Sequence, residues 1–468
     1  MVFLLEKYGR IRSVAIDRNR GSAEQTTTSL TATNFLDQNI QQVGNLSSWV
    51  PFLLAVCVFF EGPMAMSTPC DGNGGNRRHF LKTTAAVGGA ATVLTPEALL
   101  AADKFPTITL GKTGEKVTRI GMGTSWVVQP SFVQAAVFAG VTFIDTAEGY
   151  EKGNSEKTIG EVLERTKKRK DVFLVTKTHD YGKGTGGNIK KTLEDRLAKS
   201  LERLRTDYAD AYYLHGMEGS LIPLLKDPAT KAAFESLKKE KKIRFAGLSC
   251  HDKRLPEVVE AAAEVGWLDQ IMIQFNYRTM NVDAVKRAVD AAAKANIGLI
   301  AMKTQGGAGS FQELKDEPKT FRDFLAKGVK KEMAAIKTVL ADERFHVVVS
   351  EMTNRDMLKE NMEAVTSSLS KKEARVLEEH RAKTAHLYCH GCGDLCETAA
   401  KGVPVADVLR YLRYYSVYGK RAEARALYQA LPAEARDLGA ADLVAAEKAC
   451  PHGLPIVELI GRADRFMS

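Results

Sequence analysis

Four side chains suited to proton transfer occur between residues 145 and 215, and three of them follow short apolar runs. Asp145 follows VTFI, Lys177 follows VFLVT, His215 follows AYYL, and Tyr150 comes five residues after Asp145. Reduction of a carbonyl needs a hydride at carbon and a proton at oxygen. A free tyrosine has a pKa of about 10, which is too high for an ideal proton donor and acceptor at neutral pH. We therefore expect the ammonium of Lys177 to lower the pKa of Tyr150. Asp145 would keep the lysine charged, and His215 would donate a hydrogen bond to the substrate oxygen.

The elements that must position these side chains alternate between two kinds. Eight short β-branched runs occur between about residue 104 and residue 365: RIGMGT, VTFIDTA, DVFLVTK, ADAYYLHG, IRFAGLSCH, QIMIQFNY, IGLIAMK and FHVVVSEM. Amphipathic stretches separate them, including NSEKTIGEVLERT, NIKKTLEDRLAKSLERL, KAAFESLKKEKK, LPEVVEAAAEVG and VDAVKRAVDAAAKAN. Such alternation predicts parallel strands in a closed (β/α)8 TIM barrel, with an open doubly wound sheet as the competing α/β fold. A barrel would bring the four side chains to one rim, at the C-terminal ends of its strands.

These motifs resemble the aldo/keto reductase superfamily from roughly Thr107 to Val365. They occur in the family order as Asp145-Thr146-Ala147-x-x-Tyr150, Gly153-Asn154-Ser155-Glu156, Val175-Thr176-Lys177 and SLERLRTDYADAYYLHG, which ends at His215. The resemblance implies an NAD(P)H-dependent oxidoreductase that reduces a small aldehyde or ketone. The family's four catalytic residues correspond to Asp145, Tyr150, Lys177 and His215, with the tyrosine as general acid.

The same resemblance implies where a nicotinamide cofactor binds. The expected contacts are Ser249, Gln274, Lys303, Gly306, Gly307, Arg355 and Asn361. Ser249 and Gln274 would hold the carboxamide, and the two glycines would let the backbone approach phosphate closely. The sequence departs from common members in three places. Cys250-His251 replaces a usual asparagine, Met302 replaces a frequent stacking aromatic, and Glu351 replaces a glycine. No dedicated 2′-phosphate clamp is evident, so NADPH is favoured and NADH stays open.

A second constellation is formed by cysteines in the last fifth of the chain. Cys389, Cys392 and Cys396 are closely spaced, and Cys450 is followed by proline. Thiolates at such spacing can ligate iron–sulfur clusters, and some aldo/keto reductase relatives carry a C-terminal ferredoxin-like cysteine cluster. We therefore predict a [4Fe–4S] cluster on these four residues. Zinc, with His390 and His452 as alternative ligands, and a metal-free or disulfide-bonded set are the alternatives.

The N-terminal region contains paired arginines. The run Asn76-Arg77-Arg78-His79-Phe80-Leu81-Lys82 precedes TTAAVGGAATVL and resembles a twin-arginine export signal. It implies the twin-arginine machinery as a partner and export to the periplasm or cell envelope, or a cytoplasmic protein if the signal does not function. The expected divisions are an upstream segment at 1–65, disordered or not native, the signal at 66–102, the barrel at 104–368 and a mostly helical module at 369–468.

Composition limits the remaining classes of function. The chain has 468 residues, 44% of them hydrophobic, and a net charge of +9 with acids mixed among the bases. These values exclude wholesale disorder and give no reason to expect nucleic-acid binding. Two rival functions remain, a non-catalytic nicotinamide-binding redox sensor and an iron–sulfur electron-transfer subunit with an unidentified redox partner. The sequence does not identify the substrate.

Overall fold

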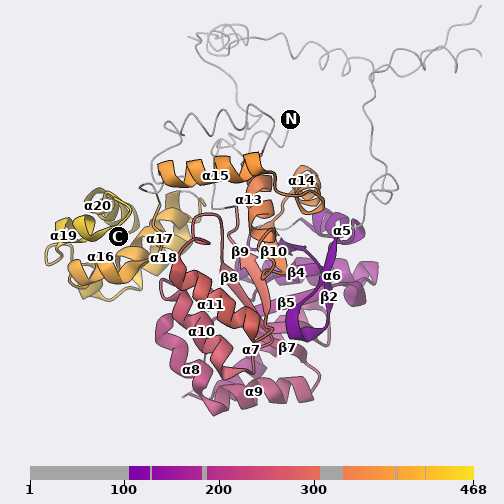
Figure 1. Ribbon diagram of the computed structural model, residues 1–468. Coiled ribbons are helices and arrows are strands. Elements are labelled where there is room, and N and C mark those ends of the chain that lie inside the picture. The colour runs from indigo at the N-terminus through magenta and orange to yellow at the C-terminus, as the bar shows by residue number, and fades with distance from the viewer. Residues whose placement is uncertain are drawn as a thin grey trace, which may run out of the picture. The chain divides into compact units, whose positions relative to one another are not determined.

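Eight parallel strands close into a barrel in the order β10-β3-β4-β5-β6-β7-β8-β9 (Figure 1). The computed structural model describes residues 105–126, 129–181, 187–305, 330–384, 386, 388–416 and 418–468. The strands are β3 (Ile120–Gly123), β4 (Phe143–Asp145), β5 (Phe173–Thr178), β6 (Ala209–Leu214), β7 (Ile243–Cys250), β8 (Gln270–Gln274), β9 (Gly298–Met302) and β10 (Val347–Glu351). Each lies within one of the eight predicted runs, except that β5 continues one residue past its run to Thr178. Val348 of β10 pairs with Ile120 of β3, which closes the sheet and excludes the open alternative.

Helices surround the strands. They are α5 (Pro130–Phe138), α6 (Asn154–Thr166), α7 (Ile189–Leu204), α8 (Ile222–Lys226), α9 (Pro228–Lys239), α10 (Leu255–Val265), α11 (Asp283–Lys294), α13 (Lys331–Leu340) and α14 (Arg355–Thr366). The five amphipathic stretches named above correspond to α6, α7, α9, α10 and α11. The apolar faces of the helices pack against the strands in one shared core. Leu193 of α7 and Val259 of α10 belong to this core together with Tyr212 of β6. This burial is the main source of barrel stability.

A short hairpin closes the end of the barrel opposite to the catalytic rim. Its strands are β1 (Thr107–Thr109) and β2 (Lys116–Thr118), and between them Leu110 is fully buried among inward-facing residues of the barrel. Gly111 adopts φ +49, and a Cβ there would lie 2.5 Å from the backbone nitrogen of Gly298. The hairpin can therefore approach the start of β9 only with glycine at this position.

The C-terminal region is helical, as predicted. Helix α15 (Lys371–Thr384) is followed by α16 (Gly393–Ala399), α17 (Val405–Ser416), α18 (Arg421–Gln429), α19 (Leu443–Ala449) and α20 (Ile456–Met467). We call residues 388–468 the C-terminal module. Its own core contains Leu412, Tyr428 and Ile460 and is distinct from the barrel core.

Side chains join the C-terminal module to the catalytic rim of the barrel. The contacts are Lys303 with Tyr414, His251 with Arg410, Lys253 with Glu397, Arg278 with Tyr388, and Trp126 with Lys420. Barrel and module belong to one unit, which spans residues 92–468. None of the described helices is long and apolar enough to cross a membrane. The predicted export signal and upstream segment lie outside the described residues, as do Gly306 and Gly307.

Candidate active site

Lys177 is the centre of a buried cluster at the C-terminal rim of the barrel. It is the penultimate residue of β5, and its side chain is 1% exposed. Its Nζ lies 2.6 Å from Oδ1 of Asp145, the last residue of β4, and donates to the backbone oxygen of Thr146 at 2.8 Å. The same Nζ lies 3.3 Å from the hydroxyl of Tyr150. Three of the four predicted residues thus meet at one ammonium group.

Burial and mutual attraction oppose each other within the Asp145–Lys177 pair. Burial raises the pKa of Asp145 and lowers the pKa of Lys177, because it disfavours both charged forms. The Coulombic attraction between the two groups counters both shifts. Removal of either partner would leave a buried, uncompensated charge, so each residue keeps the other charged.

Tyr150 begins a strained turn over the rim. It opens the 3-10 helix Tyr150–Gly153, in which Glu151 and Lys152 both adopt left-handed backbone angles, with φ of 48° and 56°. Two such residues in succession are costly and frequent near functional sites. Burial, followed by the nearby charge of Asp145, raises the pKa of Tyr150 well above its usual value. The expectation that Lys177 lowers this pKa is therefore wrong, since burial and the carboxylate outweigh the ammonium.

His215 follows β6 and completes the group of four. Its ring lies edge-on to that of Tyr150, with 5.5 Å between the ring centroids, and stacks on His179 at 3.8 Å. Burial, then the charges of His179 and Lys177, lowers the pKa of His215 well below its usual value. The imidazole is therefore neutral at physiological pH. Its Nδ1 is buried and has no hydrogen-bond partner among the described residues, so this edge of the ring can serve a bound molecule.

The Gly153–Glu156 motif forms hydrogen bonds and an ion pair next to the catalytic rim. The Ser155 hydroxyl hydrogen-bonds to the hydroxyls of Thr146 and Thr124, at 2.9 and 2.8 Å. Glu156 is fully buried, accepts a hydrogen bond from Thr176 at 2.5 Å and forms an ion pair with Arg203 at 2.6 Å. The motif therefore fastens α6 to strand residues adjacent to Asp145 and Lys177.

Ser249 lies on β7, which neighbours the β6 strand that His215 follows, and Gln274 lies on β8, the next strand around the barrel. Ser249 is buried near the end of β7, and its Oγ accepts a hydrogen bond from the backbone nitrogen of Gly216 at 3.0 Å. Gln274 is the last residue of β8 and lines a cavity of about 590 Å³. A cavity of this size suits a small organic ligand.

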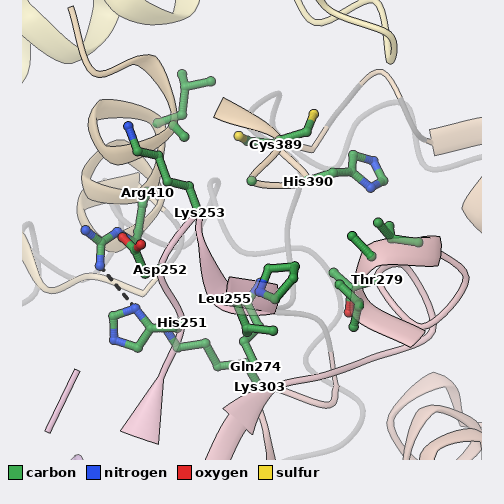
Figure 2. A pocket seen from close by; sticks show the side chains of 18 of the residues that line it. His251, Asp252, Lys253, Leu255, Gln274, Thr279, Lys303, Cys389, His390 and Arg410 are labelled. Atoms are coloured by element: carbon green, nitrogen blue, oxygen red, sulfur yellow. Dashed lines mark hydrogen bonds between the residues drawn. The ribbon is translucent and has the colours of Figure 1, made fainter. Parts of the chain in front are cut away.

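Lys303 lines the same cavity, directly after β9 (Figure 2). It adopts φ +56, and its Nζ donates to the hydroxyl of Tyr414 in α17 at 3.1 Å. Figure 2 shows Gln274 and Lys303 at the strand ends below the cavity, with Arg410 and His251 joined by a hydrogen bond at one side. The wall of the cavity therefore comes from both the barrel and the C-terminal module.

The remaining predicted cofactor residues lie elsewhere on the barrel. Arg355 is the exposed first residue of α14, and Asn361 is buried on the same helix. Asn361 donates to the hydroxyl of Ser350 at 3.0 Å, and that hydroxyl lies 3.3 Å from Oε1 of Gln305. These contacts link α14 to the ends of β9 and β10.

The four predicted cysteine ligands line one small cavity. They surround a space of about 10 Å³, close to the volume that one water needs, together with His390 and His452. None of these four described cysteines forms a disulfide bond. Burial raises the pKa of Cys389 to about 12 and that of Cys396 to about 11. No group of three or more His, Cys, Asp or Glu side chains in the described part of the chain is placed to hold a metal ion. The four thiols therefore lie around one space that no finding shows to be a metal site, so the [4Fe–4S] cluster and the zinc and disulfide alternatives stay predictions.

Several residues at the rim were missed by the sequence reasoning. His179 could have been found, because it lies two positions after Lys177 and so leaves β5 on the same side. Tyr414 and Arg410 could not, because only the folded chain brings α17 to residues more than 100 positions earlier.

Comparison with known proteins finds a family match over most of the barrel. Residues 128–382, more than half of the chain, match the aldo/keto reductase family, and residues 76–93 match the twin-arginine translocation signal sequence. The uncharacterized oxidoreductase YqkF of Bacillus subtilis is 26% identical over 300 residues, which are 58% of this chain and 95% of that protein. L-Galactose dehydrogenase of Arabidopsis thaliana is 28% identical over 284 residues, 55% of this chain and 87% of that enzyme.

Among solved structures, the holo form of an aldo-keto reductase from Bacillus halodurans is similar, with a TM-score of 0.48 and 24% identity. The match covers 59% of this chain and 96% of that one. The family match itself covers the barrel residues that carry Asp145, Tyr150, Lys177 and His215. The chain belongs to the aldo/keto reductase family and is an oxidoreductase.

Proposed function

We propose that this enzyme reduces a small aldehyde or ketone with NADPH, and that Tyr150 gives the proton to the carbonyl oxygen. The observation that carries the proposal is the convergence of three groups on Lys177 Nζ. The ammonium lies 2.6 Å from the Asp145 carboxylate and 3.3 Å from the Tyr150 hydroxyl, inside a buried cluster. A phenol beside a fixed ammonium is suited to donate a proton and then to bear a negative charge.

Each residue has a distinct task in this scheme. A bound nicotinamide supplies the hydride. Tyr150 holds its proton at neutral pH, because burial raises its pKa, and releases it only as charge develops on the substrate oxygen. Lys177 then stabilises the phenolate, while Asp145 keeps the ammonium charged and in place. The neutral His215 ring orients the carbonyl through its one N–H.

The residues near His215 are suited to hold the nicotinamide ring. Ser249 is buried beside Gly216, and Gln274 faces the cavity of about 590 Å³. The unpartnered Nδ1 of His215 and these two side chains lie at neighbouring strand ends. NADP(H) is the usual cofactor of the family, and NADPH is the cofactor that we propose here.

A steady-state assay tests the proposal. The purified enzyme is mixed with NADPH or NADH and a panel of aldehydes and ketones, and the loss of reduced-cofactor absorbance is followed. We expect turnover that is faster with NADPH and that Tyr150→Phe lowers at least a hundredfold, a usual loss when a general acid is removed. Cofactor binding without turnover by the unaltered protein would instead favour the redox-sensor function.

The cysteine ligand set stays a prediction with its own test. Iron, sulfide and zinc are measured after anaerobic purification of the unaltered protein, of Cys392→Ser, and of Cys250→Ser as the control outside the set. Metal that Cys392→Ser alone loses would establish a site at these cysteines. Metal-free protein would leave the thiols with a structural role, in line with the small cavity between them.

We further propose export through the twin-arginine pathway to the periplasm or cell envelope, which the match at residues 76–93 supports. Cell fractionation of the unaltered protein and of a variant with Arg77→Lys and Arg78→Lys tests this. Both arginines belong to the signal, so the double variant should stay in the cytoplasm. Equal distribution of the two proteins would contradict export by this route.

A further inference from the structure

The cavity beside the catalytic cluster has cationic groups on one wall. Of its lining residues, Lys303 and His251 come from the rim, while Arg410 and Tyr414 come from α17. This wall lies close to the catalytic residue His215. Ser249 accepts a hydrogen bond from the backbone nitrogen of Gly216, the residue after His215, and His251 lies two residues after Ser249. The charge of Lys303 is also one of the causes that lower the pKa of His215.

Lys303 has no acidic partner among the described residues. Its Nζ is bonded to the Tyr414 hydroxyl at 3.1 Å, and no carboxylate of the described residues lies within ion-pair distance of it. In contrast, Lys253 in the same cavity is paired with Glu397. An ammonium held at a cavity wall with a hydroxyl as partner retains most of its capacity to bind an anion.

Arg410 adds a second cation at the same wall. Its Nη2 donates to Asp407 at 2.7 Å, and its Nη1 lies 3.1 Å from Nδ1 of His251. Burial lowers the pKa of His251 well below its usual value, as do the charges of Lys303 and Arg410, so this histidine is neutral.

The pKa of Tyr414 responds to the same two positive charges, those of Lys303 and Arg410. Burial by itself raises the pKa of Tyr414, yet the charges of Lys303 and Arg410 bring it below the usual value. A site that favours the phenolate also favours other anions.

The acids that line the cavity are engaged elsewhere or exposed. Asp252 accepts hydrogen bonds from the backbone nitrogens of Gly219 and Arg254, both at 3.0 Å. Glu257 is paired with Arg254, and Glu260 is exposed on α10. Asp407 also lines the cavity and is paired with Arg410, so among the described residues Lys303 is the cation of this wall that keeps no acidic partner.

We propose that Lys303, Arg410 and Tyr414 form a subsite for a carboxylate, so that the preferred substrates are aldehydes or ketones that carry an acid group. This inference rests on the proposed carbonyl reduction and deepens it. The carbonyl would lie at Tyr150 and His215, and the acid group of the same molecule would extend toward α17. The C-terminal module thus takes part in the choice of substrate.

Matched pairs of substrates test the inference. One pair is para-carboxybenzaldehyde and its methyl ester, the other is succinic semialdehyde and its methyl ester, and kcat/KM is measured for each compound. Within each pair the carbonyl is the same and the negative charge is lost. The ratio of acid to ester is measured for the unaltered enzyme and for Lys303→Met, Lys303→Arg, Arg410→Met and Tyr414→Phe. Lys239→Met, at an exposed lysine of α9 outside the cavity, is the control for net charge.

We expect at least one acid to be preferred over its ester tenfold or more. Lys303→Met and Arg410→Met should each reduce that ratio at least tenfold, Tyr414→Phe by less, and Lys303→Arg and Lys239→Met hardly at all. Equal rates for acid and ester in both pairs would overturn the subsite while the carbonyl reduction still stood. Absence of turnover with every carbonyl compound would instead defeat the proposed function itself.

The phosphates of the cofactor are another source of anionic ligand for this wall. The KM for NADPH is therefore measured for the same variants. A rise in the KM for NADPH with an unchanged acid-to-ester ratio would assign the cations to the cofactor and overturn the subsite.

Discussion

Two tyrosine–lysine pairs lie at the catalytic rim, and their surroundings differ. Within the barrel, Lys177 lies 3.3 Å from the hydroxyl of Tyr150 and 2.6 Å from the carboxylate of Asp145. Between the barrel and the C-terminal module, Lys303 lies 3.1 Å from the hydroxyl of Tyr414 with no carboxylate at ion-pair distance among the described residues. Burial and then Asp145 raise the pKa of Tyr150, whereas the charges of Lys303 and Arg410 bring the pKa of Tyr414 below its usual value despite burial.

The difference shows that a tyrosine next to a lysine does not by itself define an acid–base residue. Asp145 takes up the charge of Lys177, so Tyr150 keeps its proton until a reacting oxygen gains charge. Arg410 is paired with Asp407, but Lys303 has no carboxylate partner among the described residues, so Tyr414 and the space beside it favour anions. The barrel pair is thus suited to proton transfer, and the second pair to binding.

The largest expected effect is on turnover. Tyr150→Phe should lower kcat by about 10²–10⁴-fold, because it removes the proton donor. Tyr414→Phe should lower kcat for a neutral aldehyde by less than tenfold, because it removes a binding hydroxyl. Steady-state rates with both variants and one ester substrate measure the contrast. Equal losses in kcat would remove the distinction between the two pairs.

The next effect is on stability. Lys177→Met leaves the buried carboxylate of Asp145 without a partner, and we expect the free energy of unfolding to fall by about 3–5 kcal/mol. Lys303→Met leaves no carboxylate behind and should cost about 1 kcal/mol, the usual value of one hydrogen bond. Urea unfolding of the two variants provides the comparison. Similar losses in both would mean that Asp145 is not charged in the folded protein.

A smaller effect concerns the junction of barrel and C-terminal module. His380 of α15 is buried, and its Nδ1 lies 3.3 Å from the hydroxyl of Tyr277. Burial, then the charges of Arg278 and Lys331, lowers its pKa from 6.5 to about 3. Between these values the unfolded chain binds a proton that the folded chain does not, so stability declines as the pH falls from about 6.5 toward 3.

The contribution of His380 to that decline amounts to about 2 kcal/mol between pH 7 and pH 5. The His380→Gln variant should lack this contribution to the pH dependence of the unfolding free energy. The contributions of the buried His215 and His251 should remain. The measurement is the difference in unfolding free energy between the two pH values, for the variant and for the unaltered protein. Identical differences would show that His380 does not lower stability in this pH range, which would contradict its burial as a neutral residue.

The two regions also differ in how far the sequence predicted them. All eight strands, and the rim that gathers Asp145, Lys177 and His215, follow from a local pattern of apolar runs that each end in a polar residue. The position of such a residue is fixed by its own strand. The sign of the Tyr150 pKa shift was wrong because burial, which sets it, depends on all the surrounding elements.

The contacts of the C-terminal module have no comparable local signal. Helix α17 is an ordinary amphipathic stretch, and nothing in its sequence indicates that Arg410 and Tyr414 face His251 and Lys303. Cysteine spacing correctly suggested that the four thiols approach one another. It did not predict that the space between them would be as small as about 10 Å³.

The smallest effect, and the most direct probe of the second pair, is the ionisation of Tyr414. Its pKa lies below the usual tyrosine value because the charges of Lys303 and Arg410 outweigh the effect of burial. In an ultraviolet titration, the unaltered protein should therefore show one early-ionising tyrosine that is absent from Tyr414→Phe. Lys303→Met should move this step to higher pH, whereas Lys303→Arg should keep it near its place. If Lys303→Met left the step unmoved, the charge at the cavity wall would come from another group, and the contrast between the two pairs would lose its cause.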